Sequence, residues 1–258
     1  KSDVLPALDP RLQVLIERKR RGFIPRATAS TARGEIPVLA RVADLAARRG
    51  YSQLFSGLSF RVAAGEVLVI TGANGTGKTT LLKLLLGDLQ PTSGKIEVGT
   101  RLEVAYFDQL RYQLDLEKTV IDNVAEGRDF IEIDGQSRHV LSYLGDFLFS
   151  PQRARTPVKA LSGGERARLL LAKLFSKPAN LLVLDEPTND LDLEAKTILK
   201  DFLAEYQHGV LLISHDRELL ALCDAVLELS NQGLKKYGGG WQSYEKEKER
   251  ERNQSLAE

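Results

Sequence analysis

The amino-acid sequence predicts an α/β fold in which helices cover a mostly parallel β-sheet. The first observation is a set of three short, wholly apolar runs at residues 67–70, 181–184 and 210–213. Strands without alternating polar residues are typical of sheets that are buried on both faces, as parallel sheets are. The second observation is that helix-like stretches separate these runs, as the connections between parallel strands require.

The ends of the three predicted strands provide the third observation. Gly72 lies just after the first strand, Asp185 and Glu186 follow the second, and Ser214 and His215 follow the third. Parallel strands bring such groups to one edge of the sheet, which is where α/β proteins bind their ligands. The sequence therefore predicts a binding site at that edge.

Composition limits the size and the setting of the protein. The chain has 258 residues, 43% of them apolar, which fits either one large domain or one domain with a small sub-lobe. A formal net charge of +1 argues against general attraction to nucleic acid or membranes. No apolar run approaches the roughly 20 residues that span a bilayer, so we expect no membrane insertion. The single cysteine, Cys223, favours a reducing, cytoplasmic setting.

Pattern and charge divide the chain into three segments. Residues 1–36 are predicted to form an appendage, and residues 245–258 a charged helical tail. Between them, residues 37–244 form the main domain, in which residues 111–157 are expected to make a small helical sub-lobe with a hairpin turn near Asp134-Gly135. The chain has no methionine and starts at Lys1, which suggests a piece of a longer protein.

The appendage also carries a basic cluster at residues 18–21. The cluster is either the solvated end of a short helix, where positive charge suits the helix dipole, or a contact for nucleic acid or the ribosome.

A glycine-rich loop after the first predicted strand matches Gly-x-x-x-x-Gly-Lys-Thr. Its glycines let backbone N–H groups turn around phosphates, and the following helix N-terminus favours negative charge. Lys78 is expected to reach the β- and γ-phosphates, and the Thr79 hydroxyl to bind Mg²⁺. The nucleotide contacts predicted from this loop are Gly72, Asn74, Gly75, Gly77, Lys78, Thr79 and Thr80.

The carboxylates after the second strand complete this chemistry. Asp185 is expected to hold the metal through its water shell, and Glu186 to polarise the attacking water. An acidic pair after a strand is common in loops, so this interpretation depends on the glycine-rich loop.

A second glycine-rich stretch, Leu-Ser-Gly-Gly-Glu at residues 161–165, opens a predicted helix. Ser162 and Glu165 fit a capping box, which is a structural role. Capping does not explain Gly163 and Gly164, which weaken a helix start yet expose backbone N–H groups to an anion.

In this order, the glycine-rich loop, Gln109, residues 161–165, the stretch at 181–192 and Ser-His-Asp at 214–216 resemble the ABC ATPase nucleotide-binding domain. The resemblance covers about residues 38–244. It implies a P-loop NTPase fold with a mostly parallel core sheet, an antiparallel β subdomain and a small helical sub-lobe. It also implies hydrolysis of ATP with Mg²⁺.

Finer resemblances point to one branch of this superfamily. Glu-Pro-Thr-Asn-Asp-Leu-Asp at residues 186–192 is similar to the ABC-F branch. Residues 105–109, 138–140 and 146–149 are similar to the second ATPase domain of Uup-type ABC-F proteins.

The resemblance implies further roles. Gln109 would touch Mg²⁺ and the attacking water, and His215 would lie near the γ-phosphate. Ser162, Gly163, Gly164 and Glu165 would form the signature motif, which contacts ATP held by a facing domain, and Asp192 would lie in the D-loop at that interface. The implied partner is a second ABC domain, either another copy or a tandem domain of a longer protein. The ABC-F branch also suggests the ribosome as a partner, and Uup-type proteins suggest DNA.

One position departs from the family pattern. The aromatic residue that stacks on adenine would fall near Ala47. Tyr51 is the nearest aromatic residue and is predicted to take that role. Stacking by Arg48 or Arg49 is the alternative.

Two other functions compete with a catalytic ABC-F domain. The chain could serve as the ATPase subunit of a membrane ABC transporter, although Asn189-Asp190 and the Uup-like stretches favour the ABC-F branch. It could also bind ATP only as a switch, although the presence of Glu186 favours turnover. His139 and His208 match no catalytic motif, so we expect ordinary surface or packing roles for them.

Overall fold

The computed structural model describes residues 37–99, 102–107, 114–133, 135–189, 191–230 and 233–255. The appendage at residues 1–36, Gln109 and Asp190 lie outside these ranges. The chain divides into two compact units. The core unit holds the described residues from 37 to 107, Lys177–Leu191 and those from Tyr206 onward. The helical unit holds those from 114 to Ser176 and Asp192–Glu205.

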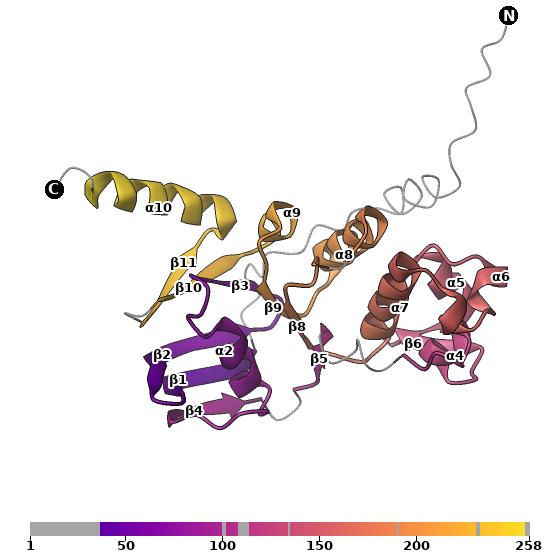
Figure 1. Ribbon diagram of the computed structural model, residues 1–258, viewed down its shortest axis with the longest axis horizontal. Helices are drawn as coiled ribbons and strands as arrows, with labels where there is room; N and C mark the ends of the chain where they lie inside the picture. Colours follow the sequence, from indigo (N-terminus) through magenta and orange to yellow (C-terminus); the bar gives the residue numbers. More distant parts are fainter. Residues whose placement is uncertain are drawn as a thin grey trace, which may run out of the picture. The chain divides into compact units, whose positions relative to one another are not determined.

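A six-stranded sheet in the order β11-β10-β3-β9-β8-β5 forms the centre of the core unit (Figure 1). Every pairing in it is parallel except that of β10 with β11, which confirms the predicted mostly parallel sheet. The strands are β3 (Val67–Thr71), β5 (Val104–Tyr106), β8 (Leu181–Asp185), β9 (Gly209–Ile213), β10 (Ala225–Ser230) and β11 (Gly233–Gly238).

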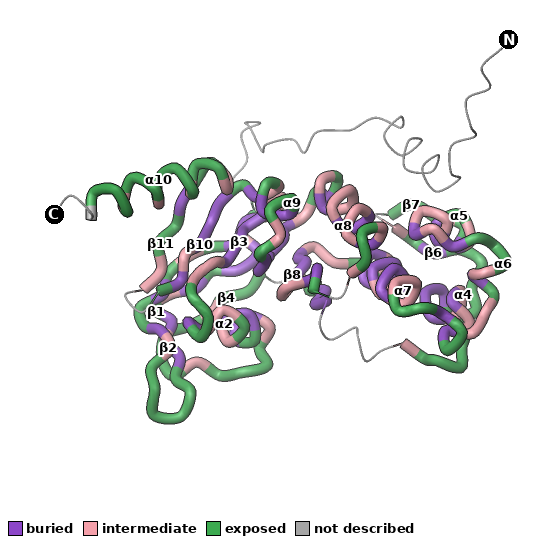
Figure 2. Tube along the Cα trace, turned by 45° about the horizontal axis from the view of Figure 1, so that its top comes forward, coloured by how far each residue is buried: buried purple, intermediate pink, exposed green. Residues whose placement is uncertain are grey.

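The three apolar runs form the neighbouring strands β3, β9 and β8. All their residues from 67–70, 181–184 and 210–213 are buried, as Figure 2 shows for β3 and β8. Because these strands run in parallel, their carboxyl ends lie along one edge of the sheet. This arrangement brings together the loops that carry the predicted site residues.

A second, antiparallel sheet has the order β2-β1-β4. Its strands are β1 (Val38–Arg49), β2 (Ser52–Ala63) and β4 (Ser93–Val98). Arg49 pairs with Ser52, so the β1–β2 turn lies at Gly50 and Tyr51. Gly50 has a φ of 61°, a left-handed conformation that favours glycine in such a turn. The sheet is the antiparallel β subdomain that the family resemblance implied.

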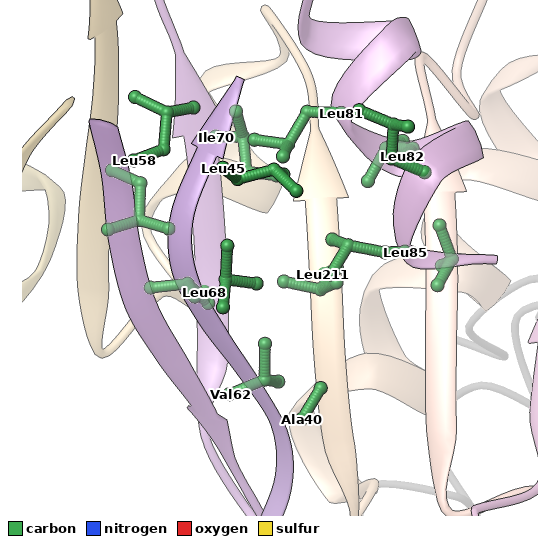
Figure 3. Packing of buried hydrophobic residues seen from close by; sticks show 14 of the residues in the cluster. Ala40, Leu45, Leu58, Val62, Leu68, Ile70, Leu81, Leu82, Leu85 and Leu211 are labelled. Atoms are coloured by element: carbon green, nitrogen blue, oxygen red, sulfur yellow. The ribbon is translucent and has the colours of Figure 1, made fainter. Parts of the chain in front are cut away.

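Apolar side chains join this sheet to β3 and to helix α2 (Lys78–Leu85). Leu45 and Leu58 come from the antiparallel sheet, Ile70 from β3, and Leu81 and Leu82 from α2 (Figure 3). Each is at most 1% exposed, and burial of such a side chain contributes about 1.5–3 kcal/mol. The cluster therefore fixes both α2 and the loop before it against two sheets.

The C-terminal helix α10 (Gly240–Ser255) packs on β10 and β11. It begins before residue 245, where the charged tail was expected to start. Glu228 on β10 accepts hydrogen bonds from the hydroxyls of Tyr237 at 2.9 Å and Tyr244 at 3.1 Å, and from Lys248 Nζ at 3.1 Å. Burial and the Glu228 charge raise the pKa of Tyr244 to about 12. The Tyr244 ring also meets the ring of Tyr237 on β11, with centroids 5.0 Å apart, so polar and aromatic contacts together hold this helix on the sheet.

The helical unit contains more of the chain than the expected sub-lobe at residues 111–157. Its strands β6 (Phe130–Ile133) and β7 (Gln136–His139) form a hairpin at the predicted turn near Asp134-Gly135. Its helices are α4 (Val120–Ala125), α5 (Val140–Gly145), α6 (Pro151–Ala154), the 3₁₀ helix η1 (Val158–Ala160), α7 (Gly163–Phe175) and α8 (Leu193–Glu205). Stacking of Phe175 on Phe202, with ring centroids 3.4 Å apart, joins α7 to α8.

The two histidines without a motif make packing contacts. His139 caps α5 by accepting a hydrogen bond from the Leu141 N–H at 3.2 Å, and its ring meets Phe130 edge-on. His208 packs against Tyr206 in the core unit.

Among the helices in the described ranges, none is long and apolar enough to cross a bilayer.

Candidate functional site

The glycine-rich loop at residues 72–79 joins β3 to α2, as predicted. Gly72, Gly75 and Gly77 have φ angles of 142°, 84° and 96°, which L side chains rarely adopt. A Cβ atom on Gly72 would lie 2.2 Å from the Leu229 carbonyl oxygen. Because that oxygen belongs to the backbone of β10, the loop can leave β3 on this path only through glycine.

The Lys78 ammonium is hydrogen-bonded to the backbone of this loop. Its Nζ donates to the carbonyl of Gly72 at 2.7 Å and to that of Ala73 at 3.1 Å. Both carbonyls are uncharged backbone groups, so they do not neutralise the positive charge of the ammonium. The residues present therefore fit a polyphosphate, whose oxygens are stronger acceptors for an ammonium than neutral carbonyls are.

Thr79 and Asp185 bring two oxygen ligands together. The Thr79 hydroxyl at the start of α2 donates to Asp185 Oδ2 at the end of β8, at 2.8 Å. A hydroxyl and a carboxylate are ligands that Mg²⁺ accepts, and Mg²⁺ commonly takes its remaining ligands from water and substrate phosphates. Gln109, the other predicted metal contact, lies outside the described residues.

Glu186 follows β8 in a strained backbone conformation. Its φ is 46°, and its N–H donates to the Ile213 carbonyl at 2.9 Å. Its Oε1 lies 3.2 Å from Nε2 of His215, which follows β9. The Glu186 side chain is 23% exposed and that of His215 is 72% exposed, so water reaches the pair. A partly exposed carboxylate can accept a proton from water, and the His215 imidazole lies within hydrogen-bond distance of it.

These groups line one pocket of about 350 Å³ in the core unit. The lining includes the predicted residues Asn74, Gly75, Gly77, Lys78, Thr79, Thr80, Asp185, Glu186 and His215. Gly72 is connected to the site by the hydrogen bond that its carbonyl accepts from Lys78 Nζ.

Tyr51 is not among the lining residues. Its side chain is 100% exposed in the β1–β2 turn, so its adenine contact stays a prediction. Arg49 and Leu54 line the pocket instead, and sequence reasoning gave Arg49 only as an alternative.

The signature motif begins helix α7 in the helical unit. The Ser162 hydroxyl accepts from the Glu165 N–H at 3.2 Å, and the Glu165 carboxylate accepts from the Ser162 N–H at 2.8 Å. This geometry confirms the predicted capping box. Arg153 Nε donates to Glu165 at 2.6 Å, and this hydrogen bond is the main cause that lowers the pKa of Glu165 to about 2. The helix start is therefore held by a paired charge as well as by its cap.

Arg168 connects this helix to the start of α8. Its side chain is 10% exposed, contacts the Glu194 carboxylate and lies 3.8 Å from Asp192 Oδ2. Asp192 Oδ1 accepts from the Ala195 N–H at 2.8 Å and so caps α8. A Cβ atom on Gly164 would lie 1.9 Å from Asp192 Oδ2, whereas one on Gly163 would meet nothing within 4 Å.

Sequence reasoning missed Arg168 and Glu194. The signal was a basic residue one helical turn after Glu165, with carboxylates at the start of the next predicted helix. Ser162, Glu165, Arg168, Asp192, Leu193 and Glu194 line a second pocket of about 500 Å³ within the helical unit.

The fold and the two pockets define a P-loop ATPase domain. The family model described as ABC transporter matches residues 55–189, just over half of the chain, so the chain belongs to the ABC ATPase family, an ATP-hydrolysing family whose domains work in pairs. A solved structure of an ATP-binding subunit of an ABC transporter shares the fold, with a TM-score of 0.61 and 23% identity over 78% of this chain and 90% of that chain.

Within this family the chain is similar to Uup-type proteins. It is 57% identical over 190 residues to the ATP-binding protein Uup of Haemophilus influenzae, covering 73% of this chain and 29% of that protein. It is 38% identical over 211 residues to the energy-dependent translational throttle protein EttA of the same organism, covering 81% of this chain and 38% of that protein. The chain thus spans about a third of the length of these relatives.

Proposed function

We propose that this chain binds Mg-ATP in the pocket of the core unit and hydrolyses it after pairing with a second ABC domain. The observation that carries the proposal is the convergence of Lys78, the Thr79–Asp185 pair and the Glu186–His215 pair on one pocket. Lys78 would bind the phosphates, and Thr79 and Asp185 would hold Mg²⁺, which supplies charge neutralisation for phosphoryl transfer.

Glu186 is proposed as the group that accepts the proton of the attacking water. Its carboxylate is partly exposed and lies within hydrogen-bond reach of His215, which would keep it oriented. The Glu186 N–H donates a hydrogen bond to the Ile213 carbonyl, and this bond fixes the backbone that carries the carboxylate. Gln109 is proposed as a further contact to the metal and the water.

Pairing is proposed because domains of this family work in pairs and because the signature motif lies at a helix N-terminus, which favours a bound anion. Ser162 and the N–H groups of the Gly163-Gly164 segment begin a helix of 13 residues, where the dipole favours negative charge. We propose that they contact the γ-phosphate of ATP bound to the partner domain, with Asp192 at the same interface. The partner is a second copy of this chain or a tandem domain.

The test is the solution mass of the Glu186→Gln variant, measured by light scattering with and without Mg-ATP. We expect bound nucleotide, turnover lowered by about 10²–10⁴-fold, and a mass that doubles only with Mg-ATP. Lys78→Ala is the control and should stay monomeric because it loses the phosphate contact.

Two outcomes would count against the proposal. Unaltered turnover in Glu186→Gln would remove the role of Glu186. A monomer in both conditions, despite bound nucleotide, would exclude pairing with a second copy of this chain and leave the tandem domain as the partner.

The cellular role is proposed from the relatives. We propose cytoplasmic, translation-linked work on the ribosome, because the similar EttA is named a translational throttle protein. Co-sedimentation of Glu186→Gln with ribosomes in Mg-ATP should exceed that of the Lys78→Ala control. Binding to DNA in place of ribosomes would favour DNA-linked work, and co-purification with a membrane permease would favour a transporter subunit.

A further inference from the structure

We propose that Arg49, and not an aromatic ring, forms the platform for the nucleobase, and that the pocket therefore accepts ATP and GTP with similar affinity. The inference rests on the proposed nucleotide function and defines its substrate class as purine nucleoside triphosphates.

The β1–β2 hairpin forms the wall beside the glycine-rich loop. A Cβ atom on Gly77 would lie 3.0 Å from Phe55 Cε1 and 3.2 Å from Leu54 Cβ, so β2 packs directly against the loop. Arg49 is the last residue of β1 and pairs with Ser52 at the start of β2. Arg49 and Leu54 thus line the same pocket as Lys78 and Glu186.

The nearby aromatic rings do not reach this wall. Phe55 is 2% exposed, so its ring belongs to the core beneath the loop. Tyr51 is 100% exposed at the turn and does not line the pocket. Among the described residues that do line the pocket, none is a phenylalanine, tyrosine or tryptophan, and the one ring is the His215 imidazole, which lies beside the Glu186 carboxylate.

The chemistry of Arg49 sets the expected selectivity. A planar guanidinium stacks on the face of an aromatic ring, and adenine and guanine both offer such a face. Leu54 adds an apolar contact that does not distinguish the two bases. A platform of this kind holds purines without rejecting guanine.

The experiment compares three ligands on the full chain by titration calorimetry: Mg-ATP, Mg-GTP and Mg-tripolyphosphate, which lacks base and ribose. For the unaltered chain we expect ATP and GTP affinities within about threefold of each other. Arg49→Ala should weaken both nucleotides by about three- to fivefold and leave tripolyphosphate unchanged. Arg49→Lys should lose about as much as Arg49→Ala, because it keeps the charge but lacks the plane.

The matched control is Arg61→Ala, which removes an exposed arginine from β2 outside the pocket. It should leave all three affinities unchanged.

Several results would overturn the inference. GTP binding more than about tenfold weaker than ATP binding would show that the pocket selects adenine. Equal weakening of tripolyphosphate in Arg49→Ala would place Arg49 on the phosphates. A loss in Tyr51→Ala without a loss in Arg49→Ala would restore Tyr51 as the base contact. Each of these results would overturn this inference alone, because the chain would still bind ATP; if the unaltered chain bound neither nucleotide, the proposed function would fall as well.

Discussion

The glycine-rich loop of the core unit and the signature motif of the helical unit are both turns that lead into a helix, but different groups hold them. In the loop, the charge of Lys78 rests on the neutral carbonyls of Gly72 and Ala73. In the signature motif, Glu165 is paired with Arg153, and Arg168 with Glu194. In the glycine-rich loop, the Lys78 ammonium contacts only neutral groups in these bonds and can bind an anion. In the signature motif, each of these charges is paired with an opposite charge of the same unit.

Their glycines differ in the same way. Gly72 faces a backbone oxygen of β10 that cannot move, and Gly164 faces the Asp192 carboxylate, which can rotate. The comparison teaches that backbone packing fixes the shape of the loop, while ion pairs fix that of the signature motif. Four measurements test this difference.

The largest effect is expected for Gly72→Ala. The added Cβ would approach the Leu229 oxygen to 2.2 Å at a φ of 142°, so overpacking and backbone strain add. We expect the free energy of unfolding to fall by at least about 3 kcal/mol in urea denaturation. Gly75→Ala is the control, because its Cβ would meet no atom within 4 Å and only the strain remains. Equal losses in the two variants would mean that contact with β10 does not fix the loop.

The next effect is expected for Arg168→Met. This change leaves the carboxylates of Asp192 and Glu194 without their shared cation. Because those side chains are 42% and 36% exposed, we expect a loss of about 2 kcal/mol, below that of a fully buried pair. Urea denaturation at low salt measures it. Arg166→Met, which removes one hydrogen bond to the Lys159 carbonyl, should cost about 1 kcal/mol. The reverse order would contradict a signature region held by ion pairs.

A smaller effect is expected for Gly164→Ala. The Asp192 carboxylate would have to rotate away and release the Ala195 N–H, which costs about 1 kcal/mol, typical of a lost helix cap. Gly163→Ala has open space and should be neutral or stabilising by up to about 1 kcal/mol. Thermal unfolding of the two variants side by side gives the difference, and identical melting curves would show that Asp192 is not in contact.

The last effect is confined to acid. The Glu165 pKa is about 2 in the folded chain and about 4.3 in an unfolded one, so its pairing stabilises the fold fully above pH 4.3. This contribution is lost as the pH falls toward 2. The difference in unfolding free energy between the unaltered chain and Glu165→Gln should therefore shrink between about pH 4.3 and 2. A difference independent of pH would exclude the ion pair as its source.

The sequence predicted those parts of the molecule that depend on local pattern. The apolar runs became adjacent strands, the glycine-rich loop joined β3 to α2, and Ser162 and Glu165 formed their capping box. Each depends on residues close together in the chain. The extent of the helical unit was not predicted, because α8 joins α7 through Arg168 and Glu194, which are 26 positions apart.

Two further features depend on tertiary register. Among the residues near Ala47, the pairing of Arg49 with Ser52 decides that Arg49 lines the pocket and that Tyr51 lies in the turn. The docking of α10 depends on Glu228, the one charged residue in strand β10. The alternating charges of the tail do not indicate which of its lysines contacts Glu228.

The left-handed backbone of Glu186 has a consequence for how this protein can change. A glutamate at a φ of 46° costs of order 1–3 kcal/mol, which glycine would largely recover. Selection for thermal tolerance alone would favour Glu186→Gly, and the same change would remove the carboxylate beside His215. If Glu186 has its proposed role, heat resistance and turnover compete at a single codon, and variants that retain activity must gain their stability elsewhere in the fold.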